Sequence, residues 1–288
     1  MSIPGATLFV VATPLGNLDD LSPRAVQVLG AADALYAEDT RRSRVLLDHF
    51  GITRRLDSLH EHNERERSAE VLAALGRGER VAILTDAGTP AVSDPGTVVV
   101  ARAAAAGFRV SPVPGPSALT AALSVAGFDV GPDGVLFLGF LPVKGREREQ
   151  AVARVAAHRG VVVIFEAPHR AAATLGELAA VAPDRAACAG RELTKLHEEL
   201  RRGTLQELAA WAAAGLKGEL TVVIAGLGPE APAAVEPTEL DAMIMKCLAA
   251  GVSARDTATA VAALTAHPRR EVYARCLALK PSGKPPPS

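Results

Sequence analysis

The sequence predicts an α/β protein in which a mainly parallel sheet is covered by helices. Short apolar runs rich in β-branched residues alternate with helical segments, as in Val81–Leu84 followed by 97–106. Several strands end in loops of Gly, Pro, Ser and Thr, such as 85–90 and 114–117. Because ligands bind outside the carboxyl ends of strands in open α/β sheets, we expect a binding site at these loops.

The first half of the chain alternates strands and helices in order. Ser22 and Pro23 mark a helix start, and Gly51, Gly76 and Gly107 mark helix ends. A polar segment, 60–67, is expected before a helix that starts at Ser68. The expected strands are 7–12, 34–37, 81–84 and 109–113, and the expected helices are 24–30, 41–50, 68–76, 97–106 and 118–126.

The second half continues the α/β pattern and is followed by helices. The expected strands are 135–140, 161–165, 186–189, 197–200 and 220–225, with helices ending at 158, 181 and 213. Three further helices are expected at 239–250, 253–266 and 269–279. The expected organisation is an N-terminal α/β domain over 1–116, a C-terminal α/β domain over 117–228, a linker over 229–237 and a helical extension over 238–288, with a disordered tail from about 281.

Composition and charge limit the classes of function. The 288 residues include 49% hydrophobic and 22% charged residues with a formal net charge of −1, so nucleic-acid binding would depend on local basic clusters. Cys188, Cys247 and Cys276 show no C-x-x-C spacing, which fits a reduced, cytoplasmic setting. No apolar stretch approaches the ~20 residues of a membrane span.

The sequence contains no complete motif of the familiar nucleotide-binding or metal-binding kinds. Gly226-Leu-Gly228-Pro-Glu-Ala231 runs into a Pro-rich segment and not into a helix, and no Walker A sequence occurs. His60-Glu61-His62 lacks further ligands at set spacing and is interpreted as a solvated polar segment. We therefore expect neither a conventional Rossmann or P-loop nucleotide site nor a metal site.

Motifs across most of the chain resemble one known family. They are Val11-Ala-Thr-Pro-Leu-Gly-Asn-Leu, Ala37-Glu-Asp-Thr-Arg41, Asp86-Ala-Gly-Thr-Pro, Pro114-Gly-Pro-Ser-Ala118, Gly139-Phe-Leu-Pro, Arg191-Glu-Leu-Thr-Lys195 and Lys217-Gly-Glu. In this order they resemble the RsmI family of bacterial small-subunit ribosomal RNA cytidine 2′-O-methyltransferases, which belongs to the tetrapyrrole-methylase type of class III S-adenosylmethionine (SAM) enzymes. Glu166-Ala-Pro-His169 departs from the Glu-Ser-Pro-His expected there, a small-for-small change.

The resemblance implies two α/β domains with SAM in the cleft between them, in a homodimer. Since the sulfonium of SAM is positively charged, its walls should be backbone carbonyls and small hydroxyls in place of Lys or Arg. By analogy with the family, the SAM contacts are Pro14, Gly88, Thr89, Val92, Ser117, Ala118, Phe165, Leu193 and Leu220.

The reaction implied is transfer of a methyl group to a ribose 2′-oxygen. A 2′-hydroxyl is a poor nucleophile at neutral pH, so a base or a cation that stabilises the incipient alkoxide should assist. Lys195 and Glu38 are preferred because both lie in strand-end motifs of the resemblance, although structural ion pairing would explain any of these charges equally well. The other candidates are Asp39, Glu166, Arg191 and Glu192.

Basic clusters would supply RNA binding on an otherwise neutral protein. The spacing of 253–266 and 269–279 resembles a helix-turn-helix whose second helix carries basic residues. Taken singly, each cluster also fits a solvated charged surface. The RNA-contact candidates in the clusters are Arg41, Arg42, Arg44, Lys144, Arg146, Arg148, Arg269, Arg270 and Arg275, with Arg54, Arg55 and Lys280 beside them.

The sequence therefore predicts a SAM-dependent methyltransferase acting on a cytidine in the decoding region of 16S ribosomal RNA, within the small ribosomal subunit. Two alternatives stay open. One is a corrin or porphyrin C-methyltransferase on the same fold, against which the basic C-terminal helices argue. The other is a non-catalytic ribosome-assembly factor, which would bind no SAM.

Overall fold

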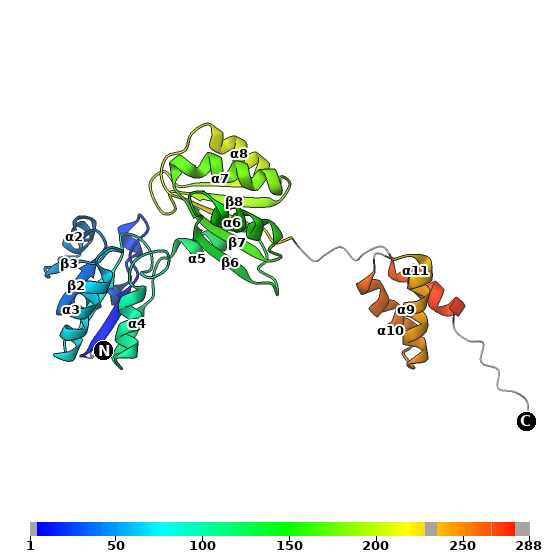
Figure 1. Cartoon of the computed structure of the whole chain (residues 1–288), viewed down its shortest axis with the longest axis horizontal. Coiled ribbons are helices and arrows are strands. Elements are labelled where there is room, and N and C mark those ends of the chain that lie inside the picture. Colours follow the sequence, from blue (N-terminus) through cyan, green and yellow to red (C-terminus); the bar gives the residue numbers. More distant parts are fainter. Residues whose placement is uncertain (1–4, 228–234, 266, 280–288) are drawn as a thin grey trace, which may run out of the picture. The chain divides into compact units, whose positions relative to one another are not determined.

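A computed structural model describes residues 5–227, 235–265 and 267–279. The chain divides into two compact units, Met1–Gly226 and Leu227–Ser288 (Figure 1). Most of the expected linker over 229–237, Lys280 and the expected tail from 281 lie outside the described residues.

The first unit begins with a parallel five-stranded sheet in the order β3-β2-β4-β1-β5. Every neighbouring pair in it is parallel, as expected, and β4 is central. Leu84, the last residue of β4, pairs with Val11 and Ala37, and Val11 also pairs with Val113, so four strands end at one level. The strands are β1 (Thr7–Val11), β2 (Ala34–Ala37), β3 (Leu56–Ser58), β4 (Val81–Leu84) and β5 (Arg109–Val113).

Helices cover both faces of this sheet. Ala82 and Leu84 of β4 pack with α1 (Pro23–Ala31) and α2 (Thr40–His49). Val81 and Ile83 point to the other face and pack with α3 (Glu64–Gly76) and α4 (Thr97–Ala105). Because neighbouring residues of a strand face opposite sides, a run of four apolar residues is what a doubly covered strand requires.

The second sheet has the order β6-β7-β10-β8-β9 and is mixed. Only β6 and β7 run parallel, so the mainly parallel arrangement that the first half of the sequence predicts, and that its sheet has, does not extend to this sheet. The physical reason is the short connection 192–198 between β8 and β9, which leaves no room for a crossover helix. The strands are β6 (Val135–Phe140), β7 (Val161–Glu166), β8 (Ala186–Arg191), β9 (Glu199–Thr204) and β10 (Leu220–Ile224).

The two faces of the second sheet carry different helices. α6 (Arg146–Ala157), α7 (Pro168–Val181) and α8 (Leu205–Ala213) bury one face, and α5 (Ala118–Ala126) packs on the other (Figure 1). The side chain of Leu220 belongs to the three-helix side, whereas Val223 packs with α5.

Two elements differ from the expected boundaries by four residues at one end. β9 lies at 199–204 and not at 197–200, because its register is set by pairing with β8, in which Arg191 opposes Glu199. Helix α3 begins at Glu64, four residues before Ser68, within the segment expected to be merely polar. Glu64 is buried, and its carboxylate accepts hydrogen bonds from Gly96 N–H at 2.9 Å and Val98 N–H at 2.8 Å.

The second unit is a three-helix bundle. It consists of α9 (Pro237–Ala249), α10 (Ala254–Leu264) and α11 (Arg269–Leu279), and the Ser253 side chain caps α10. Its core is formed by Leu240, Ile244, Ala258, Val261, Val272 and Cys276. In the part of the chain that the structure describes, no helix has the length and apolar character needed to cross a membrane.

Glu64 provides a test of a tertiary helix cap. The change Glu64→Ala should lower the free energy of unfolding by about 2 kcal/mol, because it leaves buried N–H groups at the start of α4 without an acceptor. Urea denaturation measures this change. The exposed Glu66→Ala, on the same helix, should change it by less than about 0.5 kcal/mol, and equal effects of the two would contradict the capping role.

Candidate functional site

The loops after β1, β4 and β5 are bonded into one wall. Thr13 and Gly88 form an isolated antiparallel bridge, with N···O distances of 2.8 Å and 3.0 Å. The Thr13 hydroxyl also donates to Thr85 O at 3.0 Å, and the Thr89 hydroxyl donates to Pro116 O at 3.1 Å. The strand-end loops that the sequence singled out therefore act as one structural element.

Part of this wall has a backbone conformation that side chains rarely adopt. Gly88 has φ +86°, where a glycine is favoured. Ala91 and Ser93 also lie in the left-handed region, with φ of 67° and 68°. Such conformations are unfavourable for residues with a Cβ and are found at functional sites.

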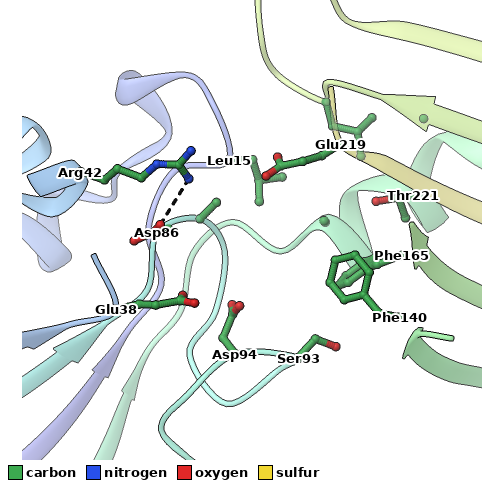
Figure 2. A pocket seen from close by; sticks show the side chains of 14 residues that line it. Leu15, Glu38, Arg42, Asp86, Ser93, Asp94, Phe140, Phe165, Glu219 and Thr221 are labelled. Carbon is green, nitrogen blue, oxygen red and sulfur yellow. Dashed lines mark hydrogen bonds and ion pairs between the residues drawn. The ribbon is translucent and has the colours of Figure 1, made fainter. Parts of the chain in front are cut away.

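A cavity of about 270 Å³ lies against this wall (Figure 2). One side comes from the first sheet and its loops, and the other from α5 and the second sheet. It is lined by Leu15, Glu38, Arg42, Asp86, Ala87, Ser93, Asp94, Ala118, Phe140, Phe165, Gly190, Leu193, Glu219 and Thr221.

The lining carries four carboxyl groups, those of Glu38, Asp86, Asp94 and Glu219. Burial raises the pKa of Asp94 to about 6, the charges of the other three add to the rise, and a hydrogen bond from Thr85 partly opposes it. Arg42 neutralises only Asp86, at 3.2 Å, and its own side chain is 67% exposed. The cavity therefore favours a positively charged ligand.

Aromatic rings line the side opposite Glu38 and Asp94 (Figure 2). Phe140 and Phe165 meet edge to face, with ring centroids 5.8 Å apart. An aromatic face attracts both cations and flat rings, so a ligand with a cationic and a planar part would suit this cavity.

Lys195 lies in an adjoining hollow that shares Leu15, Arg42, Asp86, Ala87 and Glu219 with the cavity. Its Nζ is 2.9 Å from Glu192 and 2.8 Å from Glu219. Burial opposes the charge of Lys195, but hydrogen bonds to these carboxylates outweigh it and raise the pKa of the lysine. Lys195 is therefore a cation at neutral pH and not a free base.

A glycine makes room for this lysine. A Cβ on Gly16 would lie 2.1 Å from Cγ of Lys195, so the loop after β1 can approach the lysine stem only where no side chain intervenes. The 191–195 segment is itself unusual, because Glu192 and Thr194 have φ of 51° and 66°.

Among the six catalytic candidates, Glu38 lies in the cavity wall and Lys195 beside it. Glu38 accepts a hydrogen bond from Thr85 at 3.0 Å. Glu192 accepts from Lys195 Nζ and from the backbone N–H of Glu219; burial opposes its ionisation, but these bonds outweigh it and lower its pKa. It therefore holds Lys195 in place as an ionised carboxylate.

The other three catalytic candidates have structural partners. Asp39 caps α2 and pairs with Arg41, whose hydrogen bond lowers the pKa of the aspartate. Arg191 pairs with Glu199 at 2.9 Å. Glu166 is buried, accepts from Thr174 and pairs with Arg170, and it does not line the cavity. These contacts explain the three residues without a catalytic role.

The nine cofactor candidates fall into three groups. Ala118, Phe165 and Leu193 line the cavity, and Pro14 lines the adjoining hollow. Gly88, Thr89 and Val92 belong to the wall loop, and Ser117 precedes α5 directly. Leu220 is 2% exposed within the three-helix core, so its side chain faces away from the cavity, and the neighbouring Thr221 lines it instead.

Several lining residues were not among the sequence candidates. Asp86, Phe140 and Glu219 lie within the recognised motifs, which could have identified them. Ser93 and Asp94 belong to Ser93-Asp94-Pro95-Gly96, a sequence typical of a turn before a helix, and no local pattern distinguishes a capping aspartate from one in a ligand cavity. Leu15, Gly190, Thr221 and Ala87, the last in the loop 85–90 where a binding site was expected, complete this set.

The basic candidates differ in whether their side chains are exposed or engaged in structural ion pairs. Arg44 is partly buried and donates to Arg54 O at 3.1 Å, whereas the exposed candidates are Arg41, Arg42, Lys144, Arg146, Arg269 and Arg270. Arg148 is buried, pairs with Glu177 at 2.8 Å and donates to Thr174, so the structure argues against a phosphate contact there. Arg275 pairs with Asp241 within the helical bundle, which makes it a structural residue as well.

Comparison with known proteins agrees with this geometry. The family model described as Tetrapyrrole (Corrin/Porphyrin) Methylases matches residues 7–209. The chain belongs to the tetrapyrrole methylase family, and the corresponding part of the resemblance read from the motifs is confirmed.

Within this family the chain is similar to proteins named Ribosomal RNA small subunit methyltransferase I. It is 45% identical to that of Mesorhizobium japonicum, with 95% of this chain and 92% of that protein covered. It is 43% identical to that of Mycobacterium tuberculosis, with 92% and 93% covered.

Solved structures share the fold at low identity. Diphthine synthase superposes with a TM-score of 0.60 at 17% identity, covering 76% of this chain and 89% of that chain. Cobalt precorrin-4 methyltransferase superposes with a TM-score of 0.57 at 19% identity, covering 77% and 95%. These likenesses establish the α/β fold of the family.

The raised pKa of Asp94 predicts a gain in stability on neutralisation. The folded protein holds this proton up to about pH 6, whereas an unfolded aspartate with pKa 3.8 has lost it, so stability falls as pH rises between these values. Asp94→Asn should raise Tm by about 2 °C at pH 7 and leave it unchanged at pH 4. Calorimetry at both pH values measures this, with the exposed Asp184→Asn as control; an equal shift at both pH values would contradict the cause given.

Proposed function

We propose that this protein transfers a methyl group from SAM to the 2′-oxygen of a cytidine in the decoding region of 16S ribosomal RNA. The observation that carries the proposal is the similarity to small-subunit ribosomal RNA methyltransferases I, at 36–45% identity over 92–96% of this chain. The match is long enough to include the cavity and the helical unit together. A cytoplasmic homodimer acting on the small subunit completes the proposal.

The cavity fits SAM by its chemistry. SAM carries a sulfonium and an ammonium group, and the four carboxyl groups of the lining supply the opposite charge. Phe140 and Phe165 supply faces for a planar base and a sulfonium. The small residues Ala87, Ala118 and Gly190 leave backbone close to the ligand. When bound, SAM supplies an activated methyl group on a positively charged sulfur.

Residues of this chain would handle the proton and the developing charge on the acceptor. The side chains of Glu38 and Asp94 lie on the same wall of the cavity, where either can accept the proton of a 2′-hydroxyl, and a pKa of about 6 leaves Asp94 mostly ionised at pH 7. Lys195 remains protonated between Glu192 and Glu219 and would stabilise negative charge on the incipient alkoxide. Position and electrostatics together would supply the rate.

The RNA would approach along exposed basic residues of the first unit. Arg42 stands at the cavity with its guanidinium largely exposed, and Arg41 follows on the same helix with a side chain 90% exposed. Lys144 and Arg146 are also exposed, and Arg44 is partly buried. Phosphate contacts of this kind position the substrate without reading its sequence.

Methyl transfer from labelled SAM tests the proposal. Undermethylated 30S subunits, free 16S RNA and a tetrapyrrole are offered in parallel, and the modified nucleotide is mapped. We expect label at a cytidine 2′-oxygen of the ribosomal RNA. Label in the tetrapyrrole alone would support the corrin or porphyrin alternative, and absence of SAM binding in calorimetry would support a non-catalytic assembly factor.

Lys195 is the sharpest single test of the reaction. We expect Lys195→Ala to lower kcat about 100-fold, the effect typical of losing a group that stabilises developing negative charge, while the Kd for SAM changes less than about twofold. Steady-state kinetics and calorimetry measure the two quantities. The exposed Lys217→Ala is the control, and unchanged turnover in Lys195→Ala would remove Lys195 from the mechanism.

A further inference from the structure

The helical unit has a basic hollow of its own. Its volume is about 640 Å³, and it is lined by Arg255, Arg269, Arg270 and Tyr273. Arg255 and Tyr273 lie in the two helices of the expected helix-turn-helix, but neither was among the RNA-contact candidates. The hollow shares no lining residue with the cavity of the first unit, so it is a separate candidate site.

Two helices build this hollow from matching faces. Arg255 lies one turn before Thr259 on α10, and Arg269 lies one turn before Tyr273 on α11. The Arg269 Nε donates to the Thr259 hydroxyl at 3.0 Å, which fixes the two faces against each other. Val261 and Val272 pack beneath them in the core of the unit, so the arrangement is supported by the fold.

The charges in the hollow are not neutralised within the described residues. The guanidinium groups of Arg255 and Arg270 have no hydrogen-bond or ion-pair partner there. The acidic neighbours are engaged elsewhere, Asp256 by the Ser253 hydroxyl at 2.7 Å and Glu271 by His267 at 3.3 Å. Three arginines without a carboxylate among them create a site for an anion.

The location of two arginines is unfavourable for the helix itself. Arg269 and Arg270 occupy the first turn of α11, where the helix dipole opposes positive charge. A bound anion would relieve this repulsion. Glu271 lies in the same turn, so one negative charge stands there against two positive ones.

Tyr273 adds an aromatic face to the arginines. It is 41% exposed although it is large and mostly apolar. A ring beside guanidinium groups is the combination on which single-stranded nucleic acid binds, because bases stack on the ring and phosphates meet the arginines.

We propose that Arg255, Arg269, Arg270 and Tyr273 bind a nucleotide of single-stranded RNA, with its phosphate on the arginines and its base stacked on Tyr273. The inference rests on the proposed function in that RNA is the substrate. The proposed site does not include Arg275, because that residue forms a structural ion pair with Asp241.

Binding of single-stranded RNA to the full chain tests the proposal. Fluorescence anisotropy with a labelled oligonucleotide from the decoding region should show about tenfold weaker binding for Tyr273→Leu and less than about twofold change for Tyr273→Phe, which retains the ring. The double variant Arg255→Gln/Arg270→Gln should reduce the slope of log K against log salt by about 0.7, since the contact to one phosphate is lost.

Matched controls make the test decisive. Lys246→Gln removes an exposed charge from α9 of the same bundle. It should change the slope of log K against log salt by less than about 0.35, which is half of the change expected for one phosphate contact. The nucleotide site would be overturned if Lys246→Gln changed the salt slope as much as the arginine double variant does. It would also be overturned if Tyr273→Leu weakened binding of duplex RNA of the same sequence as much as binding of the single strand, or if no variant altered binding. Equal capture of an acidic peptide would indicate a protein partner and overturn it as well.

Failure of this proposal can be distinguished from failure of the proposed function. The Tyr273→Leu chain should bind SAM with unchanged affinity and retain kcat at saturating RNA, with KM raised about tenfold. A wild-type chain that binds no SAM but binds the oligonucleotide through these residues would end the methyltransferase proposal alone. Unchanged KM would end the nucleotide site alone.

Discussion

The backbone pairing of Thr13 with Gly88 is the constraint on which the cavity depends. It joins loops that follow neighbouring parallel strands, with N···O distances of 2.8 Å and 3.0 Å. The loop after β4 then brings Asp86 and Asp94 into the same cavity wall as Glu38, which follows β2. Burial there raises the pKa of Asp94, and repulsion from the neighbouring carboxylates adds to the rise. The fold accepts this unfavourable charge where a cationic ligand would compensate it.

Local patterns in the sequence were sufficient for most of the fold because they reflect local physics. Four apolar residues in β4, the Ser22 cap of α1 and the capping box of Thr204 and Glu207 all depend on neighbours in sequence. The errors arose from partners distant in sequence. The bounds of β9 follow from its pairing with β8, and Glu64 begins α3 while it caps α4. The hydrophobic periodicity of the sequence does not reveal such partners.

The candidate site shows the same division at the level of single side chains. Leu220 and Thr221 are neighbours, but strand alternation turns Leu220 into the core and Thr221 toward the cavity, so an error of one residue reverses the role. Charged residues at strand ends are equally ambiguous. Glu38 faces the cavity, whereas its neighbour Asp39 caps a helix. The sequence indicates that charged residues gather at the strand ends. Only the tertiary structure shows which of them line a ligand cavity and which form a structural ion pair.

A net charge of −1 conceals two regions of opposite character. The cavity of the first unit is acidic, which suits the proposed sulfonium ligand, and the hollow of the helical unit is basic, which suits the proposed RNA. One surface could not serve both, because carboxylates that attract the cofactor repel phosphates. Arg42 stands at the boundary, where it pairs with Asp86 and exposes the rest of its guanidinium. A polyanion would thus be held by arginines outside the cavity, and only an uncharged group such as a ribose hydroxyl would enter among the carboxylates.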